Sequence, residues 1–171
     1  MERQRVAAPT ARFAQPTDAP AVTAFRCGHT PWYVEEAAKV IRKSASLLDA
    51  SPPGLRVVLF EHAHELAGIS VVQQGPTHGT ADLAVLAIRT HLQGAWIEET
   101  PERPLCVAVL EETIDLAARE GYERIVAMAA EQNTKSVRLI TRAGFSRVAP
   151  LDGDYVLYQA VLPVVEAPEL T

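Results

Sequence analysis

The stretch Asn133-Thr-Lys-Ser-Val-Arg-Leu-Ile-Thr-Arg-Ala-Gly-Phe145 follows directly after residues 124–130, an apolar run with the pattern of a buried β-strand. Asn133 can accept a hydrogen bond from the first free N–H groups of a helix, so it suits the N-cap position. Gly144 can adopt the left-handed conformation that ends a helix. The stretch therefore predicts a strand, a capped short helix and a sharp turn in direct succession.

This succession resembles the Asn-x-x-Ser/Ala-x-x-Leu-Tyr-x-x-x-Gly-Phe segment of the GCN5-related N-acetyltransferase (GNAT) superfamily. Glu65-Leu-Ala-Gly68 is similar to the Glu-Leu-Val-Gly that opens the second hairpin strand of that family. Phe25-Arg-Cys-Gly28 is similar to the Phe-Asp-Cys-Gly of a branch that includes tRNA-acetylating toxins. The resemblance implies an α/β (α+β) fold with a mixed, mostly antiparallel central sheet, flanked by helices and splayed at its central strand.

The spacing of apolar residues and turn residues predicts the same order of elements. Thr30 and Pro31 suit the N-cap and the first position of a helix. The run that starts at Ala81 is apolar on both faces, which is typical of a central strand covered on both sides. The expected elements are a helix over 31–49, a hairpin of 55–61 with 65–72, the central strand 81–89, a helix over 105–120, the strand 124–130, the helix after Asn133 and a hairpin of 146–149 with 155–162.

A chain of 171 residues that is 48% hydrophobic fits one globular domain, which buries about 70% of its unfolded surface. We expect this domain over residues 22–162. Residues 1–21 contain three prolines, which predicts a poorly ordered arm or a short edge strand. Residues 163–171 have few apolar anchors, so we expect a C-terminal tail.

Charge and cysteine content exclude several classes of protein. The net charge is −5 and no run of five Lys or Arg occurs, which argues against nucleic acid as the main partner. Cys27 and Cys106 lie far apart, and neither has a Cys or His at metal-ligand spacing, so we expect a reduced, cytoplasmic protein without a bound metal. No segment has the length of a secretory signal core or a membrane span.

The family resemblance implies that acetyl-coenzyme A (acetyl-CoA) lies in the gap beside the central strand and serves as acetyl donor. By position, the pantetheine arm pairs with the backbone of Leu86, Ala87 and Ile88. An unpaired strand edge can offer N–H and C=O groups to amides of a ligand as it would to another strand. One of these N–H groups could also stabilise the oxyanion that develops during acyl transfer.

The resemblance further implies a pyrophosphate-binding loop of the form Gln/Arg-x-x-Gly-x-Gly/Ala after that strand. Gln93, Gly94 and Ala95 match its start, but Trp96 and Glu98 occupy the two glycine positions. The segment 98–104 resembles an insertion that adds three Glu and two Pro, which bring negative charge and remove N–H donors. Two alternatives remain. Either the strand edge, these loop residues and the Asn133 region still bind the cofactor, or coenzyme A binding has been lost.

Acetyl transfer to an amine requires a base, because an ammonium with a pKa of about 10.4 carries no attacking lone pair at neutral pH. Asp82, early in the central strand, is the candidate, because protein-acetylating family members carry a Glu there; a solvent-facing or turn-capping Asp is the alternative. The Tyr that the family uses as an acid is replaced by Ile140. Tyr155 could substitute, although it could equally be a packed strand aromatic, and water could protonate the thiolate instead.

Two residues of the opening stretch are cofactor-binding candidates by the same resemblance. The family counterpart of Asn133 commonly contacts the pantetheine arm or positions the thioester. Ser136 lies one helical turn later and would face the same gap. Helix capping alone for Asn133, and an inert first-turn position for Ser136, are the alternatives.

These features predict an N-acetyltransferase that moves acetyl from acetyl-CoA to a primary amine of a small molecule or a protein. Trp96, Glu98 and Ile140 favour the alternative of a catalytically silent GNAT-like domain with a binding or regulatory role. Phe25-Arg-Cys-Gly28 favours a tRNA-acetylating toxin, and the negative net charge argues against it. A homodimer is implied by the resemblance alone.

Overall fold

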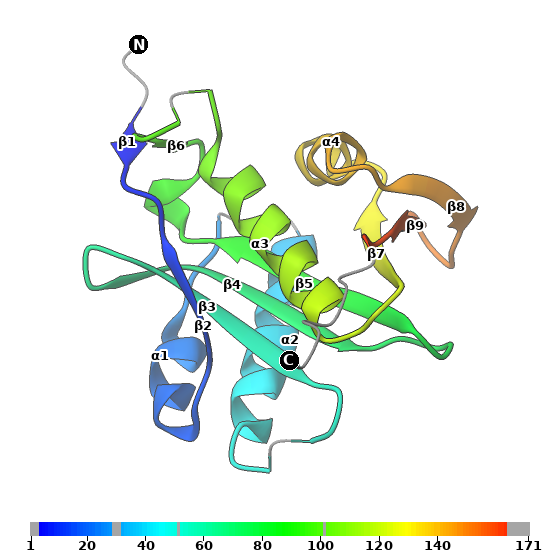
Figure 1. The fold of residues 1–171 in the computed structure, drawn as a ribbon, viewed down its shortest axis with the longest axis horizontal. Helices are drawn as coiled ribbons and strands as arrows, with labels where there is room; N and C mark the ends of the chain where they lie inside the picture. The colour runs from blue at the N-terminus through cyan, green and yellow to red at the C-terminus, as the bar shows by residue number, and fades with distance from the viewer. Residues whose placement is uncertain (1–3, 29–31, 51, 101, 164–171) are drawn as a thin grey trace, which may run out of the picture.

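The computed structural model describes residues 4–28, 32–50, 52–100 and 102–163, which form a seven-stranded sheet with helices on both faces (Figure 1). The strand order is β2-β3-β4-β5-β7-β9-β8. Neighbouring strands are antiparallel except for β5 and β7, which run parallel. The strands are β2 (Thr10–Phe13), β3 (Arg56–His62), β4 (Glu65–Gln74), β5 (Thr80–Ile88), β7 (Arg124–Ala130), β8 (Ser146–Pro150) and β9 (Tyr155–Val161). The predicted mixed, mostly antiparallel sheet is confirmed.

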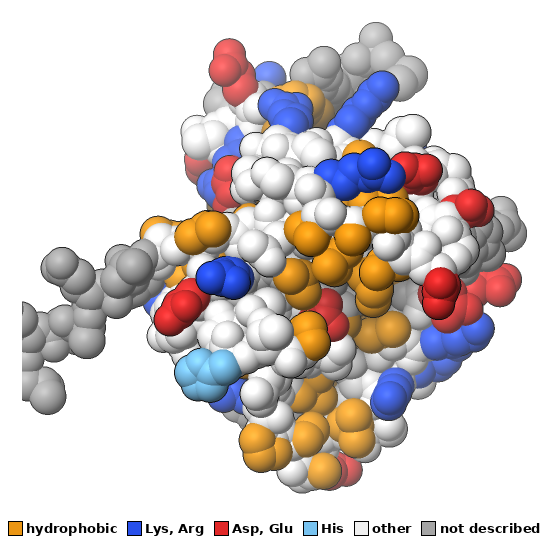
Figure 2. All heavy atoms as spheres, turned by 90° about the vertical axis from the view of Figure 1, so that its right-hand side faces the viewer, with side chains coloured by type: hydrophobic (Ala, Val, Ile, Leu, Met, Phe, Trp, Pro, Cys, Tyr) orange, Lys and Arg blue, Asp and Glu red, His pale blue; other side chains and the backbone are white. Residues whose placement is uncertain are grey.

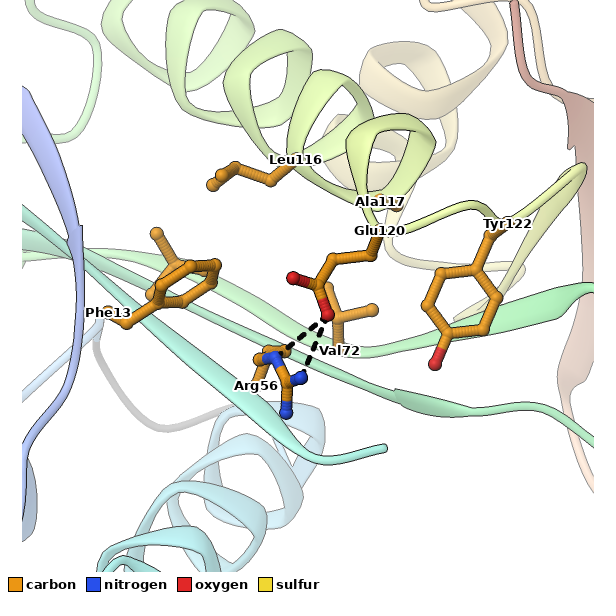
Figure 3. A pocket seen from close by; sticks show the side chains of 8 residues that line it. Phe13, Arg56, Val72, Leu116, Ala117, Glu120 and Tyr122 are labelled. Carbon is orange, nitrogen blue, oxygen red and sulfur yellow. Dashed lines mark hydrogen bonds and ion pairs between the residues drawn. The ribbon is translucent and has the colours of Figure 1, made fainter. Parts of the chain in front are cut away.

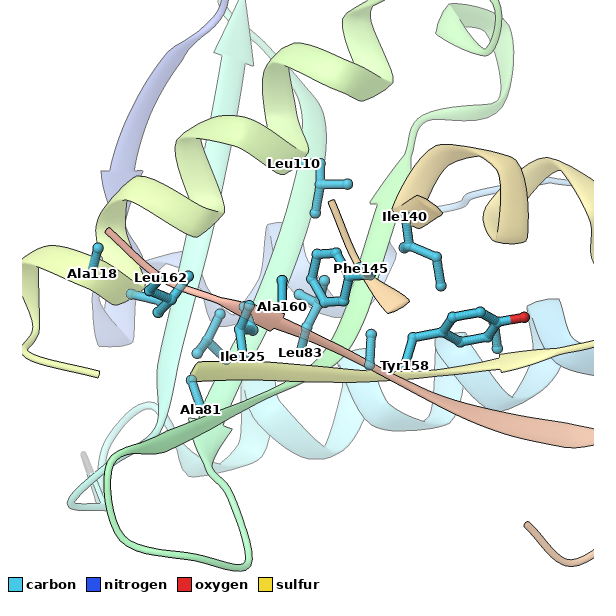
Figure 4. Close-up of a cluster of buried hydrophobic side chains, with 14 of the residues drawn as sticks. Ala81, Leu83, Leu110, Ala118, Ile125, Ile140, Phe145, Tyr158, Ala160 and Leu162 are labelled. Atoms are coloured by element: carbon cyan, nitrogen blue, oxygen red, sulfur yellow. The ribbon is translucent and has the colours of Figure 1, made fainter. Parts of the chain in front are cut away.

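The helices divide between the two faces of the sheet. On one face lie α1 (Ala19–Ala24) and α2 (Trp32–Leu47), and on the other lie α3 (Leu105–Arg119) and α4 (Thr134–Arg142) (Figure 1). Ile41 of α2 packs in one cluster with side chains of β3, β4 and β5. Leu110 of α3 and Ile140 of α4 pack in another cluster with β5, β7 and β9 (Figure 4). The sheet is therefore buried from both sides around β5, as its apolar sequence predicts.

The predicted elements between residues 31 and 162 are present, with small shifts at their ends. The helix expected over 105–120 is α3, and the strand expected over 124–130 is β7 without any shift. Thr30 and Pro31, expected at the start of a helix, lie outside the described residues, so their placement stays a prediction. The tail beyond Pro163 also lies outside them.

The N-terminal segment is more structured than an arm with a single edge strand. Residues of β2 pair with β3 at the sheet edge, and β1 (Arg5–Val6) pairs in parallel with β6 (Trp96–Ile97). Sequence patterns did not predict α1, although Pro20 suits a helix start. Val22, with 0% of its surface exposed, and Phe25, with 3%, anchor this segment under the sheet. Their burial, a tertiary effect, orders a segment whose three prolines argue for disorder.

The β3–β4 hairpin has a tight turn built from unusual residues. His62 pairs with Glu65, so Ala63 and His64 form a two-residue loop. Their φ angles are 48° and 64°, the left-handed region that favours Gly and Asn. The predicted hairpin is therefore present with a turn of the kind that matches strand twist but strains these two residues.

A small recess lies where the C-terminal end of α3 meets β2 and β3 (Figure 3). Arg56 of β3 donates from Nε to Oε2 of Glu120 at 3.0 Å across this recess. Glu120 follows the last turn of α3, where the helix dipole disfavours negative charge, so Arg56 offsets an unfavourable position. The recess is otherwise apolar, and its residues serve the packing of α3 on the sheet.

Candidate functional site

The two central strands part from one another halfway along their length. The parallel pairing of β5 with β7 runs from Thr80 opposite Arg124 to Leu83 opposite Ala127 and stops there. Both strands continue beyond that point, β5 to Ile88 and β7 to Ala130. The second half of β5 keeps its pairing with β4 alone, and the second half of β7 keeps its pairing with β9 alone. The sheet is therefore splayed at its central strand, as predicted.

A bulge in β5 lies where the strands part. Val71 of β4 pairs with Val85 and Val72 pairs with Leu83, so Ala84 is an extra residue on β5. A bulge of this kind bends its strand and increases the local twist. The bulge at Ala84 thus gives a physical reason for β5 to leave β7 directly after Leu83.

The orientation of the β5 backbone beyond the bulge follows from one hydrogen bond. The N–H of Arg89 donates to the carbonyl of Ala67 at 2.8 Å, so residue 89 turns its backbone groups toward β4. Successive residues alternate between the two sides of a strand, so Ala87 also faces β4 while Leu86 and Ile88 face the gap. Of the three residues predicted to pair with the pantetheine arm, Leu86 and Ile88 turn their backbone groups to the gap, and the contact itself stays a prediction. Ala87 is placed to pair with β4.

The backbone of β7 presents a matching edge. The N–H of Glu131 donates to the carbonyl of Asp154 at 2.8 Å, so odd-numbered residues of β7 turn toward β9. Met128 and Ala130 therefore turn their backbone groups toward the gap. The Ala130 carbonyl accepts from the N–H of Asn133 at 2.9 Å, and no described strand lies beside Met128 on this side. Main-chain groups of Leu86 and Met128 thus face the space between the parted strands.

Gln93 closes one end of this edge. Its Nε2 donates to the Ile88 carbonyl at 3.3 Å, in the position where the amide of a ligand could donate. The same nitrogen lies 3.4 Å from where a Cβ on Gly28 would stand, so the side chain bridges β5 and the Phe25–Gly28 segment. Gln93 is therefore beside the candidate site, and its side chain is engaged within the protein.

The loop after β5 has few free backbone donors. Five N–H groups in residues 93–98 donate to carbonyls of the protein itself. The pairs are Gln93 to Thr90, Ala95 to Leu92, Trp96 to Gln4, Ile97 to Arg103 and Glu98 to Val6. Gly94, with φ of 85°, is the residue of this loop whose N–H has no backbone acceptor among the described residues. A pyrophosphate cradle needs several N–H groups that converge on the anion. The loop in this chain does not offer them.

The N-terminal arm engages two of these donors. Gln4 and Val6 of the arm accept from Trp96 and Glu98, and the N–H of Ala8 donates to Oε2 of Glu99 at 3.1 Å. At the start of α3, the N–H of Leu105 donates to the carbonyl of Ala95 at 2.9 Å. Ala95 itself is 1% exposed, so this predicted cofactor-binding residue is part of the core. Trp96 also forms an antiparallel bridge with Pro104, so residues 96–100 and 102–104 belong to a loop that is closed at its base beside α3.

Asn133 caps α4, as its position in the sequence predicts. Its Oδ1 accepts from the N–H of Ser136 at 3.3 Å. The Nδ2 of Asn133 has no hydrogen-bond partner among the described residues, so it can still donate to a ligand. Ser136 is half-buried in the first turn. Capping and ligand contact therefore use different atoms of Asn133 and do not exclude each other.

Asp82 lies within β5, where the strand is still paired on both sides. It is opposite Gln73 of β4 and Val126 of β7. The Nε2 of Gln73 donates to its Oδ2 at 2.8 Å, which leaves Oδ1 without a partner among the described residues. Asp82 is half-buried, two residues before the strands part. The structure therefore places Asp82 beside the start of the gap, and its role as a general base stays a prediction.

At position 140, where the resemblance to the GNAT segment implies a Tyr that acts as an acid, this chain has an isoleucine that packs in the core. Ile140 is 6% exposed and lies with Phe145 and Tyr158 in the core between α4 and β9 (Figure 4). Tyr155, the candidate substitute, pairs with Ala130 across β7 and β9. Burial raises the pKa of the Tyr155 phenol above its usual value, and the charge of Glu36 on α2 raises it further. The phenol therefore keeps its proton at neutral pH.

The sequence analysis did not single out two features of this region. One face, turned to the viewer in Figure 2, carries a band of hydrophobic side chains beside β7, β8 and β9. Met128 is 55% exposed, Val148 53% and Val161 78%. The second feature is a set of cations on α4, Lys135, Arg138 and Arg142, all exposed. The spacing of these cations is visible in the sequence, but the sequence does not show what they face.

Among the described residues, no helix combines the length and the apolar character that a membrane crossing requires. The part of the chain that the structure describes also contains no group of three or more His, Cys, Asp or Glu side chains arranged to hold a metal ion.

Neither a protein-family model nor a curated protein matches the sequence. Solved structures do match the fold. An acetyltransferase from Thermus thermophilus is 22% identical, with 92% of this chain and 99% of that chain covered and a TM-score of 0.68. The ribosomal-protein-S18-alanine N-acetyltransferase from Escherichia coli is 19% identical, with 95% and 98% covered and a TM-score of 0.64.

A third structure was solved with a ligand. The PaiA N-acetyltransferase from Thermoplasma acidophilum, in complex with coenzyme A, is 12% identical, with 90% of this chain and 98% of that chain covered and a TM-score of 0.65. The three matches span nearly the whole of both chains. The chain has the fold of the GNAT acetyltransferases, as the segment from Asn133 to Phe145 predicts.

Proposed function

We propose that this protein is an N-acetyltransferase that transfers acetyl from acetyl-CoA to a primary amine. The observation that carries the proposal is the parting of β5 and β7 after Leu83, with backbone groups of Leu86 and Met128 turned into the gap. An arm with two amides can hydrogen-bond to such edges as an added strand does. The fold alone would not assign this role, because one fold can host several functions.

The residues around the gap supply roles for the chemistry. Asp82 takes a proton from the substrate ammonium, directly or through a water, so that the amine lone pair can attack the thioester carbon. The N–H of Leu86 donates to the oxyanion that forms on the thioester oxygen. Breakdown of the tetrahedral adduct would break the carbon–sulfur bond, the amine nitrogen would lose its second proton to water, and Tyr155 or water would protonate the departing thiolate. These assignments follow from the positions of the residues beside the gap.

The acceptor is an amine of a small molecule or a protein. The Escherichia coli structure of the same fold is named for an amine on a protein, the alanine of ribosomal protein S18. In this chain Asp82 and Glu36 bring negative charge to the α2 side of the sheet, which attracts an ammonium. The exposed Met128 on β7 adds an apolar contact.

A binding domain without catalytic activity is the second candidate. It is favoured by the closed 93–98 loop, whose N–H groups are engaged by the protein itself, and by Ile140 in the place of the family's acid. Such a domain would bind acetyl-CoA or another ligand in the gap and release no thiol.

A thermal melt followed by a turnover assay separates these candidates. Acetyl-CoA at about 100 times its dissociation constant should raise the free energy of unfolding by about 2.7 kcal/mol, which is a shift of several degrees. A panel of amines is then tested for release of free thiol. Binding with release supports the enzyme. Binding without release, or no shift at any concentration of acetyl-CoA, supports the silent domain and contradicts the proposed activity.

A further inference from the structure

We propose that the acceptor is a primary amine that carries an apolar group next to its nitrogen, and that Met128 of β7 and Leu157 of β9 bind this group. The inference rests on the proposed function, because it names the class of acceptor for the same site. A free alkylamine and the N-terminus of a protein whose first side chain is apolar share this chemistry. The test has an arm for each source.

One half of the sheet has a face on which no helix packs among the described side chains. Ala127 and Ala129 of β7 belong to the core cluster under α3 and α4, so strand alternation turns Met128 to the opposite face, where α2 lies. In β9, the residues on either side of Leu157 belong to the same cluster, so Leu157 also faces the α2 side. The described apolar side chains of α2 pack on β3, β4 and β5, and none of them belongs to a cluster with β7, β8 or β9. The described part of the chain therefore leaves this face of β7 and β9 open.

Three side chains form an apolar row across this open face. Met128 and Leu157 lie directly opposite each other in the pairing of β7 with β9, and Ala149 of β8 lies opposite Leu157. Neighbouring strands are about 4.8 Å apart, so the row extends for about 10 Å. Met128 is 55% exposed although β7 is an inner strand of the sheet, and Leu157 and Ala149 are half-buried. A contiguous apolar surface of this kind is typical of a binding site.

The apolar row begins where β5 and β7 part. The last pair of the two strands is Leu83 with Ala127, so Met128 is the first residue of β7 beyond the parting. Asp82 lies on the same face as Met128, because Leu83 next to it belongs to the cluster under α3 and α4. Asp82 is opposite Val126, and the next residue of β7 on that face is Met128. An amine whose nitrogen meets Asp82 beside the gap therefore has its substituent against Met128 and the rest of the row.

The chemistry of the row favours an apolar substituent. A hydroxyl or a second ammonium placed on it would leave water without gaining a hydrogen-bond partner. An alkyl or aromatic group gains about fourfold in affinity for each CH₂ that is buried. The unbranched, flexible side chain of Met128 can adapt to groups of different shape. The ammonium itself is matched by Asp82, whose Oδ1 has no partner among the described residues.

The test measures kcat/KM for two matched pairs of acceptors. Hexylamine is compared with 5-aminopentanol, in which a hydroxyl replaces the terminal methyl group. A peptide that begins with Leu is compared with one that begins with Asn, a side chain of similar size. Each pair is assayed with the wild type, with Met128→Gln, which keeps nearly the same length and adds polarity, and with Val161→Thr. Val161 is the control because it is 78% exposed and lies four residues from Leu157 along β9, about 13 Å away.

The wild type should prefer hexylamine, the Leu peptide or both over their polar partners by about fourfold or more. Met128→Gln should lower this preference by about threefold, with no change for the polar acceptors, and Val161→Thr should leave it unchanged. An apolar preference in either pair supports the proposal, and the larger kcat/KM identifies the source of the acceptor. Equal preference in the wild type and in Met128→Gln overturns the proposal.

Calorimetry of the two amines in the presence of coenzyme A distinguishes this inference from the proposed function. If no acceptor is acetylated but hexylamine binds more tightly than 5-aminopentanol, and Met128→Gln removes the difference, the binding surface is supported and acetyl transfer is contradicted. Equal binding of the two amines to the wild type overturns the inference. If the row is instead an interface between two copies of the chain, Met128→Gln dissociates a dimer in sedimentation without changing the amine preference, which also overturns it.

Discussion

At the scale of single residues, Asp82 carries the largest part of the proposed chemistry. Its Oδ2 is held by Gln73, and its other oxygen is available on the side of the sheet where α2 lies. A general base contributes about 10²–10⁴ in rate, so Asp82→Asn should lower kcat/KM by about 100-fold or more at neutral pH. The loss should shrink toward pH 9, because the substrate amine then loses its proton without help.

The measurement is the pH–rate profile of Asp82→Asn between about pH 6 and pH 9, with Asp115→Asn, an exposed change on α3, as control. If Asp82→Asn keeps full activity over this range, Asp82 is not the base.

Tyr155 makes a different prediction about pH. Its pKa lies above the ordinary 10.0, with burial as the main cause, so the phenol is protonated at every pH below that value. If it protonates the thiolate, Tyr155→Phe should lower kcat by about tenfold or more. The wild-type profile should then show no alkaline decline from this group below pH 10. An unchanged kcat in the variant would assign the proton to water.

Substitutions at Asn133 can distinguish an effect on stability from an effect on binding, because Oδ1 caps α4 and Nδ2 is the proposed ligand contact. Asn133→Ala removes the cap and should lower the free energy of unfolding by about 1 kcal/mol. Asn133→Asp keeps an acceptor for the Ser136 N–H but replaces the Nδ2 donor with an oxygen. We therefore expect Asn133→Asp to keep the melting temperature and to weaken acetyl-CoA binding several-fold. Equal binding by wild type and Asn133→Asp would restrict Asn133 to capping.

At the scale of elements, the β3–β4 hairpin contains strain that does not serve the site. Ala63 and His64 both have positive φ, which costs about 1–2 kcal/mol per residue for side chains other than Gly, Asn or Asp. Replacing the pair with Asn-Gly should stabilise the protein by about 1 kcal/mol and raise its melting temperature by a few degrees. Acetyl-CoA affinity should not change. A lower melting temperature would show that His62 and Glu65 do not hold this register.

Long periodic segments of the sequence predict their elements well, and short segments with distant partners do not. The strand at 124–130 and the helix α3 follow from local apolar spacing, and Asn133 with Gly144 marks both ends of α4. The pairing of β1 with β6 has no local signal, because a two-residue strand depends on a partner far away in sequence. The same pairing decides that the amides of Trp96 and Glu98 are engaged.

Some features of the candidate site could be predicted from the sequence, and others depend on the folded structure. The gap, Asn133 and the departure at Trp96 and Glu98 are visible from sequence by resemblance. Which backbone groups point into the gap depends on strand register, and the bulge at Ala84 shifts that register by one residue. Leu86 and Ile88 can therefore be told apart from Ala87 only in the folded structure.

At the scale of the whole molecule, the sheet consists of two parts joined at the start of β5 and β7. One part, β2-β3-β4-β5, is covered by α1 and α2, and the other, β7-β9-β8, is covered by α4 (Figure 1). α3 packs against β4, β5 and β7 and so spans the junction. The parted strands lie between these two units. We propose that the unpaired edges of β5 and β7 bind a thioester-bearing arm where the two strands no longer pair with each other.

Amide hydrogen exchange followed by NMR tests this claim most directly. In the free protein, the amides of Leu86 and Met128 should exchange quickly, while those of Val85 and Ala87, which pair with β4, exchange slowly. Saturating acetyl-CoA should slow exchange at Leu86 and Met128 and leave Val85 and Ala87 nearly unchanged. Slow exchange at Leu86 and Met128 in the free protein, or no response of either amide to acetyl-CoA, would contradict the account.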